Sequence, residues 1–207
     1  MARRAALVAL SGLLVALLVG CGGDDDEPSS SAPETPTESA EVAGPTGLEQ
    51  YLLQDGDIPG LVPIDSPVTN ESDPFDLPPG GAEVLQRSGY VATTFQPAEG
   101  EEAAGVSSVL LFDSEQGARA WMAYETLESV LRFQIPEGDF DRFRVRDVPG
   151  ARGWTGPDLH GNAIGNVYWT QGRCMLLVAI ETEGPKVEPL STGAQAIYER
   201  TGGTCPE

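Results

Sequence analysis

The sequence predicts an α+β domain in which an antiparallel sheet of about five to six strands carries helices on one face. Two observations lead to this prediction. Segments with the alternating or unbroken apolar pattern of strands occur in pairs separated by short turns, which is typical of antiparallel hairpins. A segment with helical spacing of apolar residues follows each pair, so the order strand, strand, helix occurs twice within residues 46–207.

The predicted domain begins with a short helix and a long loop. Thr46 and Glu49 have the spacing of a capping box, and Gly56 is placed to end the helix. Residues 65–82 are dense in Pro and Gly and predict a loop. A loop of this length is functional or mobile, and its sequence does not indicate which.

A hairpin and the longest predicted helix follow. Residues 89–96 and 106–112 have strand patterns and are joined by an acidic turn. Asp113 and Gln116 have capping-box spacing, and apolar residues then recur at helical intervals until the chain approaches Pro136. These segments form the first strand–strand–helix unit.

The second half of the domain is a looser copy of the first. Tyr168 and Trp169 are neighbours on one predicted strand, so only one of the two rings is expected to face the core. The predicted strands are residues 140–148, 162–170 and 173–182, and the predicted final helix is residues 192–201.

A basic and then apolar N-terminus predicts an export signal. Arg3 and Arg4 precede fifteen mainly apolar residues, 5–19, and the run Leu18-Val19-Gly20-Cys21 ends the segment. Fifteen residues rise only about 22 Å as a helix, against a hydrocarbon core of roughly 30 Å, so a permanent spanning helix is not expected.

This run resembles the signal of bacterial lipoproteins, whose signal peptidase II cuts before a cysteine. The resemblance implies that residues 1–20 are removed and that Cys21 becomes a lipidated first residue. Acyl chains on Cys21 would then hold the chain on the extracytoplasmic side of the cell membrane. The alternative is an ordinary secretory signal in which the cysteine is a coincidence.

The charge of the chain excludes some partners and defines a tether. The chain has 12 Lys and Arg against 32 Asp and Glu, a net charge of −20, and loss of Arg3 and Arg4 would lower it to −22. Such a surface repels nucleic acid and anionic lipid headgroups, and nucleic-acid binding is not expected. Residues 21–45 are acidic and almost free of large apolar side chains, which predicts a disordered tether. We interpret the run Asp24-Asp25-Asp26-Glu27 as solvated charge rather than as a cation site.

The cysteines predict one disulfide. With Cys21 assigned to lipid, Cys174 and Cys205 remain, and both would lie in an oxidising compartment, where thiols pair. The alternative is a reactive Cys174 assisted by His160, the only histidine. We favour the disulfide because Cys174 begins an apolar strand, whereas a reactive cysteine needs access and a lowered pKa.

No catalytic motif is recognisable, and the chain is not expected to be an enzyme. A single histidine cannot supply a histidine-based metal cluster, so neither a metal nor a cofactor is predicted. Arg142, Arg144 and Arg146 alternate with apolar residues, with Arg152 nearby, so on a strand they would share one face. This face is a candidate site for a phosphate, a carboxylate or a lipid headgroup. The alternative is an exposed strand face whose arginines pair with the many acids.

As a whole, the domain resembles uncharacterised actinobacterial cell-envelope lipoproteins. The features that carry the resemblance are the acidic tether, the turns at Asp57-Ile58-Pro59-Gly60 and Val148-Pro149-Gly150, the segment 112–121 and the C-terminal helix with its disulfide. A more distant likeness is to the extracellular sensor domains of actinobacterial serine/threonine kinases. The resemblance implies a non-enzymatic ligand-binding or sensor-like domain. The alternative is a structural or protein-interaction lipoprotein of the envelope without a small-molecule ligand.

Overall fold

The structure is a computed structural model that describes residues 47–71, 77, 80–134, 139–157, 162–184 and 186–206. The predicted export signal, Cys21, the acidic tether, Thr46 and His160 lie outside the described residues.

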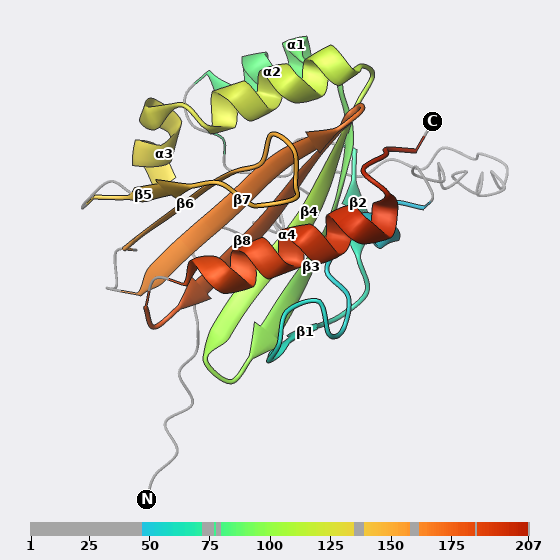
Figure 1. The fold of residues 1–207 in the computed structure, drawn as a ribbon. Coiled ribbons are helices and arrows are strands. Elements are labelled where there is room, and N and C mark those ends of the chain that lie inside the picture. The colour runs from blue at the N-terminus through green and yellow to red at the C-terminus, as the bar shows by residue number, and fades with distance from the viewer. Residues whose placement is uncertain are drawn as a thin grey trace, which may run out of the picture. The chain divides into compact units, whose positions relative to one another are not determined.

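An antiparallel sheet of eight strands organises the described residues (Figure 1). Neighbouring strands follow the order β1-β3-β4-β8-β7-β6-β5, and β2 also pairs with β3. The predicted fold class is confirmed, with more strands than the five to six expected. The strands are β1 (Leu61–Pro63), β2 (Val68–Asn70), β3 (Tyr90–Gly100), β4 (Ala103–Phe112), β5 (Asp141–Phe143), β6 (Arg152–Pro157), β7 (Ala163–Gln171) and β8 (Cys174–Thr182).

Helices cover both faces of this sheet, whereas the sequence predicted them on one. In Figure 1, α4 crosses one face, and α1, α2 and α3 gather on the other side. Two separate core clusters reflect this arrangement, one with Leu190 of α4 against Leu176 and one with Trp121 of α2 against Met175. The helices are α1 (Gly81–Arg87), α2 (Glu115–Glu125), α3 (Glu128–Gln134) and α4 (Val187–Thr201).

Coverage on both faces explains why the neighbouring rings of Tyr168 and Trp169 are both buried. Because adjacent strand residues point to opposite faces, Tyr168 enters the cluster around α2 and Trp169 enters the cluster around α4. The expectation that one of these rings would face outward was therefore wrong. Helix-covered strands have no solvent face, so alternation along β7 does not separate core from surface.

The strand–strand–helix order recurs along the chain but is not a spatial repeat. The pairs β3-β4 and β8-β7 run antiparallel on opposite sides of the sheet centre, and the helices that follow them lie on opposite faces. To superpose one unit on the other, three directions would have to be reversed at once: the order of the two strands across the sheet, the direction in which each strand runs, and the face on which the helix lies. That operation is an inversion, which no rotation of a chiral chain can perform.

Several predicted elements are shorter than expected. The helix expected before Gly56 is only a 3₁₀ turn, η1 (Glu49–Tyr51). The long predicted helix begins after Ser114, whose hydroxyl accepts from the Gly117 N–H at 3.1 Å. It is interrupted at Thr126, whose backbone N–H and hydroxyl both donate to the Met122 carbonyl, at 3.1 and 2.9 Å.

Short elements also occur where the sequence predicted none. The predicted loop 65–82 contains β2 and the beginning of α1. The strand predicted over residues 140–148 ends at Phe143, and Asp147 then adopts a left-handed φ of 64° in a turn. β6 was not predicted at all, because Gly153, Gly156 and Pro157 give it the composition of a loop.

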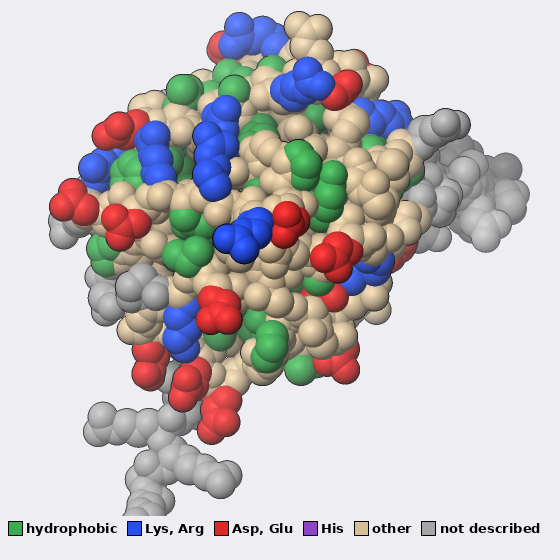
Figure 2. Space-filling view, viewed as in Figure 1, with side chains coloured by type: hydrophobic (Ala, Val, Ile, Leu, Met, Phe, Trp, Pro, Cys, Tyr) green, Lys and Arg blue, Asp and Glu red, His purple; other side chains and the backbone are tan. Residues whose placement is uncertain are grey.

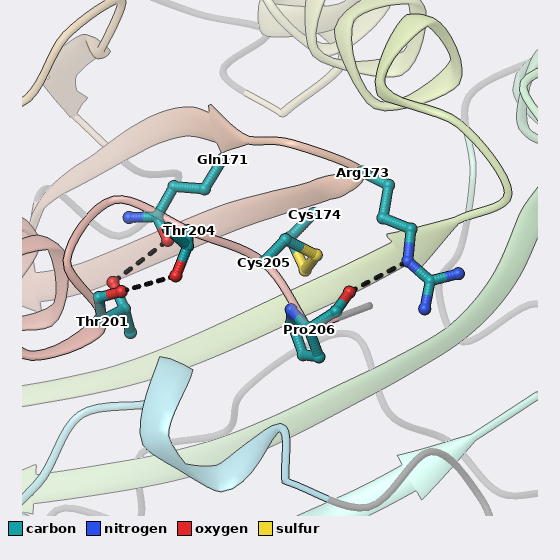
Figure 3. Close-up of a disulfide and its surroundings, with 7 residues drawn as sticks. All are labelled: Gln171, Arg173, Cys174, Thr201, Thr204, Cys205 and Pro206. Atoms are coloured by element: carbon teal, nitrogen blue, oxygen red, sulfur yellow. Dashed lines mark hydrogen bonds between the residues drawn. A yellow bond between two sulfur atoms is a disulfide. The ribbon is translucent and has the colours of Figure 1, made fainter.

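The predicted disulfide is present and fixes the C-terminus to the sheet (Figure 3). Cys174 begins β8, Cys205 follows α4, and their Cα atoms lie 5.7 Å apart. Next to it, the side chains of Gln171 and Thr201 form a buried hydrogen bond of 3.1 Å. The Arg173 Nε donates to the carbonyl of Pro206 at 3.1 Å, which holds the chain beyond the disulfide.

Candidate functional site

A surface pocket of about 370 Å³ opens where the β5 edge of the sheet meets the junction of α2 and α3. Its volume is in the lower part of the range of roughly 300–1,000 Å³ that is usual for small-molecule sites. The pocket is lined by Thr126, Leu131, Arg142, Phe143, Arg144, Arg152, Gly153 and Trp154.

Pairing of β5 with β6 and of β6 with β7 brings the basic lining residues together. Arg142 lies opposite Trp154 across β5 and β6, so the two side chains share one face of the sheet. Arg152, the first residue of β6, lies opposite Tyr168 on the same face. Arg144 follows the end of β5 by one residue.

Each guanidinium group at the pocket has a contact that limits its orientation. The Arg152 Nη1 donates to the Thr126 hydroxyl at 3.2 Å, and the Arg144 Nη1 donates to the Ala151 carbonyl at 3.5 Å, a long hydrogen bond. Arg142 lies 5.3 Å from the centre of the Phe140 ring. These contacts use few of the five N–H donors that each guanidinium carries.

The pocket has a positive charge in an acidic chain. Arg142 forms a long, exposed salt bridge of 3.9 Å with Glu128, whereas within the described part of the chain Arg144 and Arg152 form none. None of the lining residues is acidic. Figure 2 shows basic side chains gathered near the β5 edge of the sheet. An anion that enters the pocket would therefore meet guanidinium charge with little competition from carboxylates.

The polar groups of the lining side chains are donors. The indole Nε1 of Trp154 is buried and has no hydrogen-bond partner among the described residues, and Trp154 is only 2% exposed. The Thr126 hydroxyl already donates its proton to the Met122 carbonyl. A buried donor without an acceptor costs roughly 1–3 kcal/mol, so a ligand rich in acceptor oxygens suits this pocket.

The structure brings together part of the predicted arginine face. Arg142 and Arg144 line the pocket, but Arg146 does not, because β5 ends before it and the chain turns. The backbone carbonyl of Arg146 instead accepts from Gln195 Nε2 on α4 at 2.9 Å. Arg152 takes the third place through its position on β6.

Trp154, Thr126 and Leu131 were not recognised as site residues. They come from three elements that meet only in the folded chain, and no spacing in the sequence relates them. The one available signal was a tryptophan, Trp154, between Gly153 and Thr155 in a segment that otherwise resembles a loop.

Two further findings concern the described residues as a whole. They contain no cluster of His, Cys, Asp or Glu side chains suited to hold a metal ion. None of the helices in the described ranges combines the length and the apolar character needed to cross a membrane.

Comparison with known proteins relates the chain to others by fold. No protein-family model and no curated protein matches it. The extracellular domain of PknH from Mycobacterium tuberculosis superposes with a TM-score of 0.53 at 13% identity, over 74% of this chain and 94% of that one. A putative uncharacterized protein, the Rv0999 ortholog from Mycobacterium smegmatis, gives a TM-score of 0.40 at 11% identity, over 70% and 90%. The chain therefore shares its fold with a mycobacterial extracellular domain.

Proposed function

We propose that this protein is an extracytoplasmic, membrane-anchored domain that binds a small anionic ligand without transforming it. The carrying observation is the pocket in which Arg144 and Arg152 meet without a carboxylate partner among the described residues. In a chain with a net charge of −20, acids are abundant enough to pair with any exposed arginine. Arg87, Arg146 and Arg173 also form no salt bridge among the described residues, so an external anion is favoured by the convergence of Arg142, Arg144 and Arg152 on one opening that no acidic residue lines.

The lining residues suit binding better than catalysis. Their polar groups supply hydrogen-bond donors and permanent positive charge, which orient and hold an anion. The one hydroxyl among them, on Thr126, is engaged by both Met122 and Arg152. No lining residue is a histidine, a cysteine or a carboxylate, so none is a ready general base or activated nucleophile.

Two features support a place outside the cytoplasm. The disulfide is of a kind that persists in oxidising compartments, and the fold is that of a mycobacterial extracellular domain. We further propose lipidation at Cys21, followed by an acidic tether of about 24 residues. A flexible tether of that length spans roughly 25–30 Å, so the folded domain would lie close to the membrane. Ligand would then be met near the outer surface of a membrane.

Binding is tested with the anionic dye 1-anilinonaphthalene-8-sulfonate and the intact chain in a non-ionic detergent. Arg144→Gln is expected to weaken dye binding roughly tenfold, because a charged hydrogen bond contributes about 1.5–3 kcal/mol. Arg146→Gln removes the same charge outside the pocket and is expected to leave dye binding unchanged. Equal affinities of the two variants would contradict the proposal.

The anchor is tested by partitioning cell extracts between detergent and aqueous phases. Cys21→Ser is expected to move the protein to the aqueous phase or the medium, or to leave it unprocessed, because it removes the site of acylation. Unchanged recovery of the processed variant in the detergent phase would contradict lipidation at Cys21.

A further inference from the structure

We propose that the ligand of the arginine pocket is a phosphate monoester that carries a small apolar group. This inference rests on the proposed function and narrows it from any small anion to one class. It follows from three properties of the lining residues, namely their charge, the number and placement of their donors, and the apolar surface beside them.

The charge favours a dianion. Three guanidinium groups, those of Arg142, Arg144 and Arg152, line one opening, and only Arg142 forms a salt bridge with a carboxylate among the described residues, at 3.9 Å. A carboxylate or a sulfate ester carries one negative charge and would leave the other guanidinium groups repelling each other. A phosphate monoester carries about 1.5 to 2 negative charges at neutral pH and compensates more of this repulsion.

The donors favour a tetrahedral group. A planar carboxylate presents two oxygens and suits one guanidinium fork. A phosphate monoester presents three terminal oxygens, one for each of the three arginines that approach from β5, from the residue after it and from β6. The contacts of Arg152 with Thr126 and of Arg144 with Ala151 restrict both groups before a ligand arrives, which lowers the entropic cost of binding.

The remaining lining favours an organic substituent over inorganic phosphate. Phe143, which is partly exposed, lines the same pocket, together with Leu131 and Trp154, which are each only 2% exposed. The Trp154 indole N–H is buried and has no acceptor among the described residues. A ligand with its phosphate at the arginines and a small ring or short chain against these apolar residues would contact both the charged and the apolar part of the pocket.

Three aromatic probes separate charge from shape in calorimetric titrations of the intact chain in a non-ionic detergent, and inorganic phosphate is the fourth probe. Phenyl phosphate is a tetrahedral dianion, phenyl sulfate is a tetrahedral monoanion, and benzoate is a planar monoanion. We expect phenyl phosphate to bind roughly tenfold or more tightly than phenyl sulfate, since its second negative charge strengthens the same hydrogen bonds to the guanidinium groups, and a charged hydrogen bond contributes about 1.5–3 kcal/mol. Benzoate is expected to bind most weakly, and inorganic phosphate to bind more weakly than phenyl phosphate.

Matched variants locate the binding. Arg144→Gln and Arg152→Gln are each expected to weaken phenyl phosphate binding roughly tenfold or more, while Arg146→Gln serves as the control of equal charge change. Circular dichroism of each variant establishes that it is folded.

Phosphatidic acid in phosphatidylcholine vesicles presents the same phosphate monoester at a surface. The sedimented protein is the Cys21→Ser chain, which lacks the acyl anchor, and vesicles of phosphatidylcholine alone give the baseline. Sedimentation with phosphatidic acid above this baseline that Arg144→Gln abolishes would assign the phosphate to a lipid, and binding of phenyl phosphate alone would assign it to a soluble ligand.

The outcomes distinguish this inference from the proposed function. If phenyl sulfate or benzoate binds as tightly as phenyl phosphate and Arg144→Gln weakens all three, the pocket binds anions but the phosphate inference is wrong. If no probe binds, or if Arg146→Gln has the same effect as Arg144→Gln, both the inference and the proposed function are wrong.

Discussion

The side chain of Arg200 on α4 holds the N-terminal segment of the domain, where the sequence predicted a helix. Its guanidinium donates to both carboxylate oxygens of Asp57 at 2.9 Å and to the carbonyls of Gln50 and Leu52. Asp57 in turn accepts from the backbone N–H of Gln54. The ion pair is largely buried, with the two side chains 23% and 12% exposed. Arg200 thereby satisfies the Gln50 carbonyl within the 3₁₀ turn and the Leu52 carbonyl directly after it, which supports the turn.

Arg200→Ala is therefore expected to lower the free energy of unfolding by about 2–4 kcal/mol, since it leaves a carboxylate and two carbonyls without this donor. Arg200→Lys should lose less, because one ammonium reaches only part of this set. Urea denaturation measures both. Arg119→Ala, which breaks an exposed pair with Glu115 on α2, is the control and should change stability by less than about 0.5 kcal/mol. An equally small effect at Arg200 would contradict the clamp.

Tyr51 connects burial to stability at alkaline pH. Burial raises the pKa of its phenol above the ordinary 10.0, and hydrogen bonds with Thr204 and Gln50 oppose this rise. Above about pH 10 the unfolded chain loses this proton first, so the folded state binds more protons and the free energy of unfolding falls as pH rises. Tyr51→Phe should reduce that fall between about pH 9 and pH 11, measured by urea denaturation. An unchanged slope would show that Tyr51 does not contribute.

At the scale of elements, α2 begins at a close contact that reverses the effect expected of a Gly-to-Ala substitution in a helix. Gly117 lies in its first turn, and a Cβ there would overlap the backbone carbonyl oxygen of Ser88 at the end of α1. Helix propensity alone predicts that Gly117→Ala stabilises by up to about 1 kcal/mol. The contact predicts the opposite sign, because a backbone carbonyl cannot move aside as a side chain would.

We expect Gly117→Ala to destabilise the protein by about 1–3 kcal/mol, the usual cost of overpacking. Urea denaturation measures the change in the free energy of unfolding. Gly184→Ala is the matched control, since a Cβ there meets no atom within 4 Å. Stabilisation by Gly117→Ala would show that α1 and α2 are not in the contact described.

Long elements were predictable from the sequence, and short ones were not. β4, β7, β8 and α4 have apolar patterns over nine residues or more, long enough for a period to be recognised. β1, β2 and β5 have three residues each, so they exist only because a neighbouring strand offers hydrogen bonds. These strands follow from the order of the sheet, and three residues are too few to indicate that order.

The candidate site was predictable in part for the same reason. Alternation placed Arg142 and Arg144 on one face; one lies in β5, the other follows it directly, and both line the pocket. The same alternation included Arg146, which the turn at Asp147 removes from the face. Arg152 reaches the pocket through pairing of β6, a relation between strands that no local spacing contains.

At the scale of the whole domain, the disulfide joins β8, the last strand in the sequence and a central one in the sheet, to the C-terminal segment after α4. It closes a loop with a sequence separation of 31 residues, which contains all of α4. In the chain-entropy description such a loop contributes about 3–4 kcal/mol. Replacement of both cysteines by alanine should lower the free energy of unfolding by that amount. The parent protein in reductant should lose as much, and losses below about 0.5 kcal/mol would contradict a stabilising role.

Charge also acts at this scale. The long-range field of an acidic chain disfavours anions, so binding at the arginine pocket depends on short contacts and on local charge. Salt screens the long-range repulsion more strongly than the close pairs, since the Debye length is about 8 Å at physiological ionic strength. A selective anion site is therefore compatible with an acidic surface.

The most direct test of anion binding at the pocket observes the arginine side chains themselves. In the intact chain labelled with ¹⁵N, the Nε resonances of Arg144 and Arg152 are followed by NMR during titration with phenyl phosphate and assigned with the glutamine variants. We predict saturable shifts of these two resonances, with a smaller shift of Arg142 and none of Arg146. Equal shifts of Arg144, Arg146 and Arg152, or no shift of any of them, would contradict an anion site at this pocket.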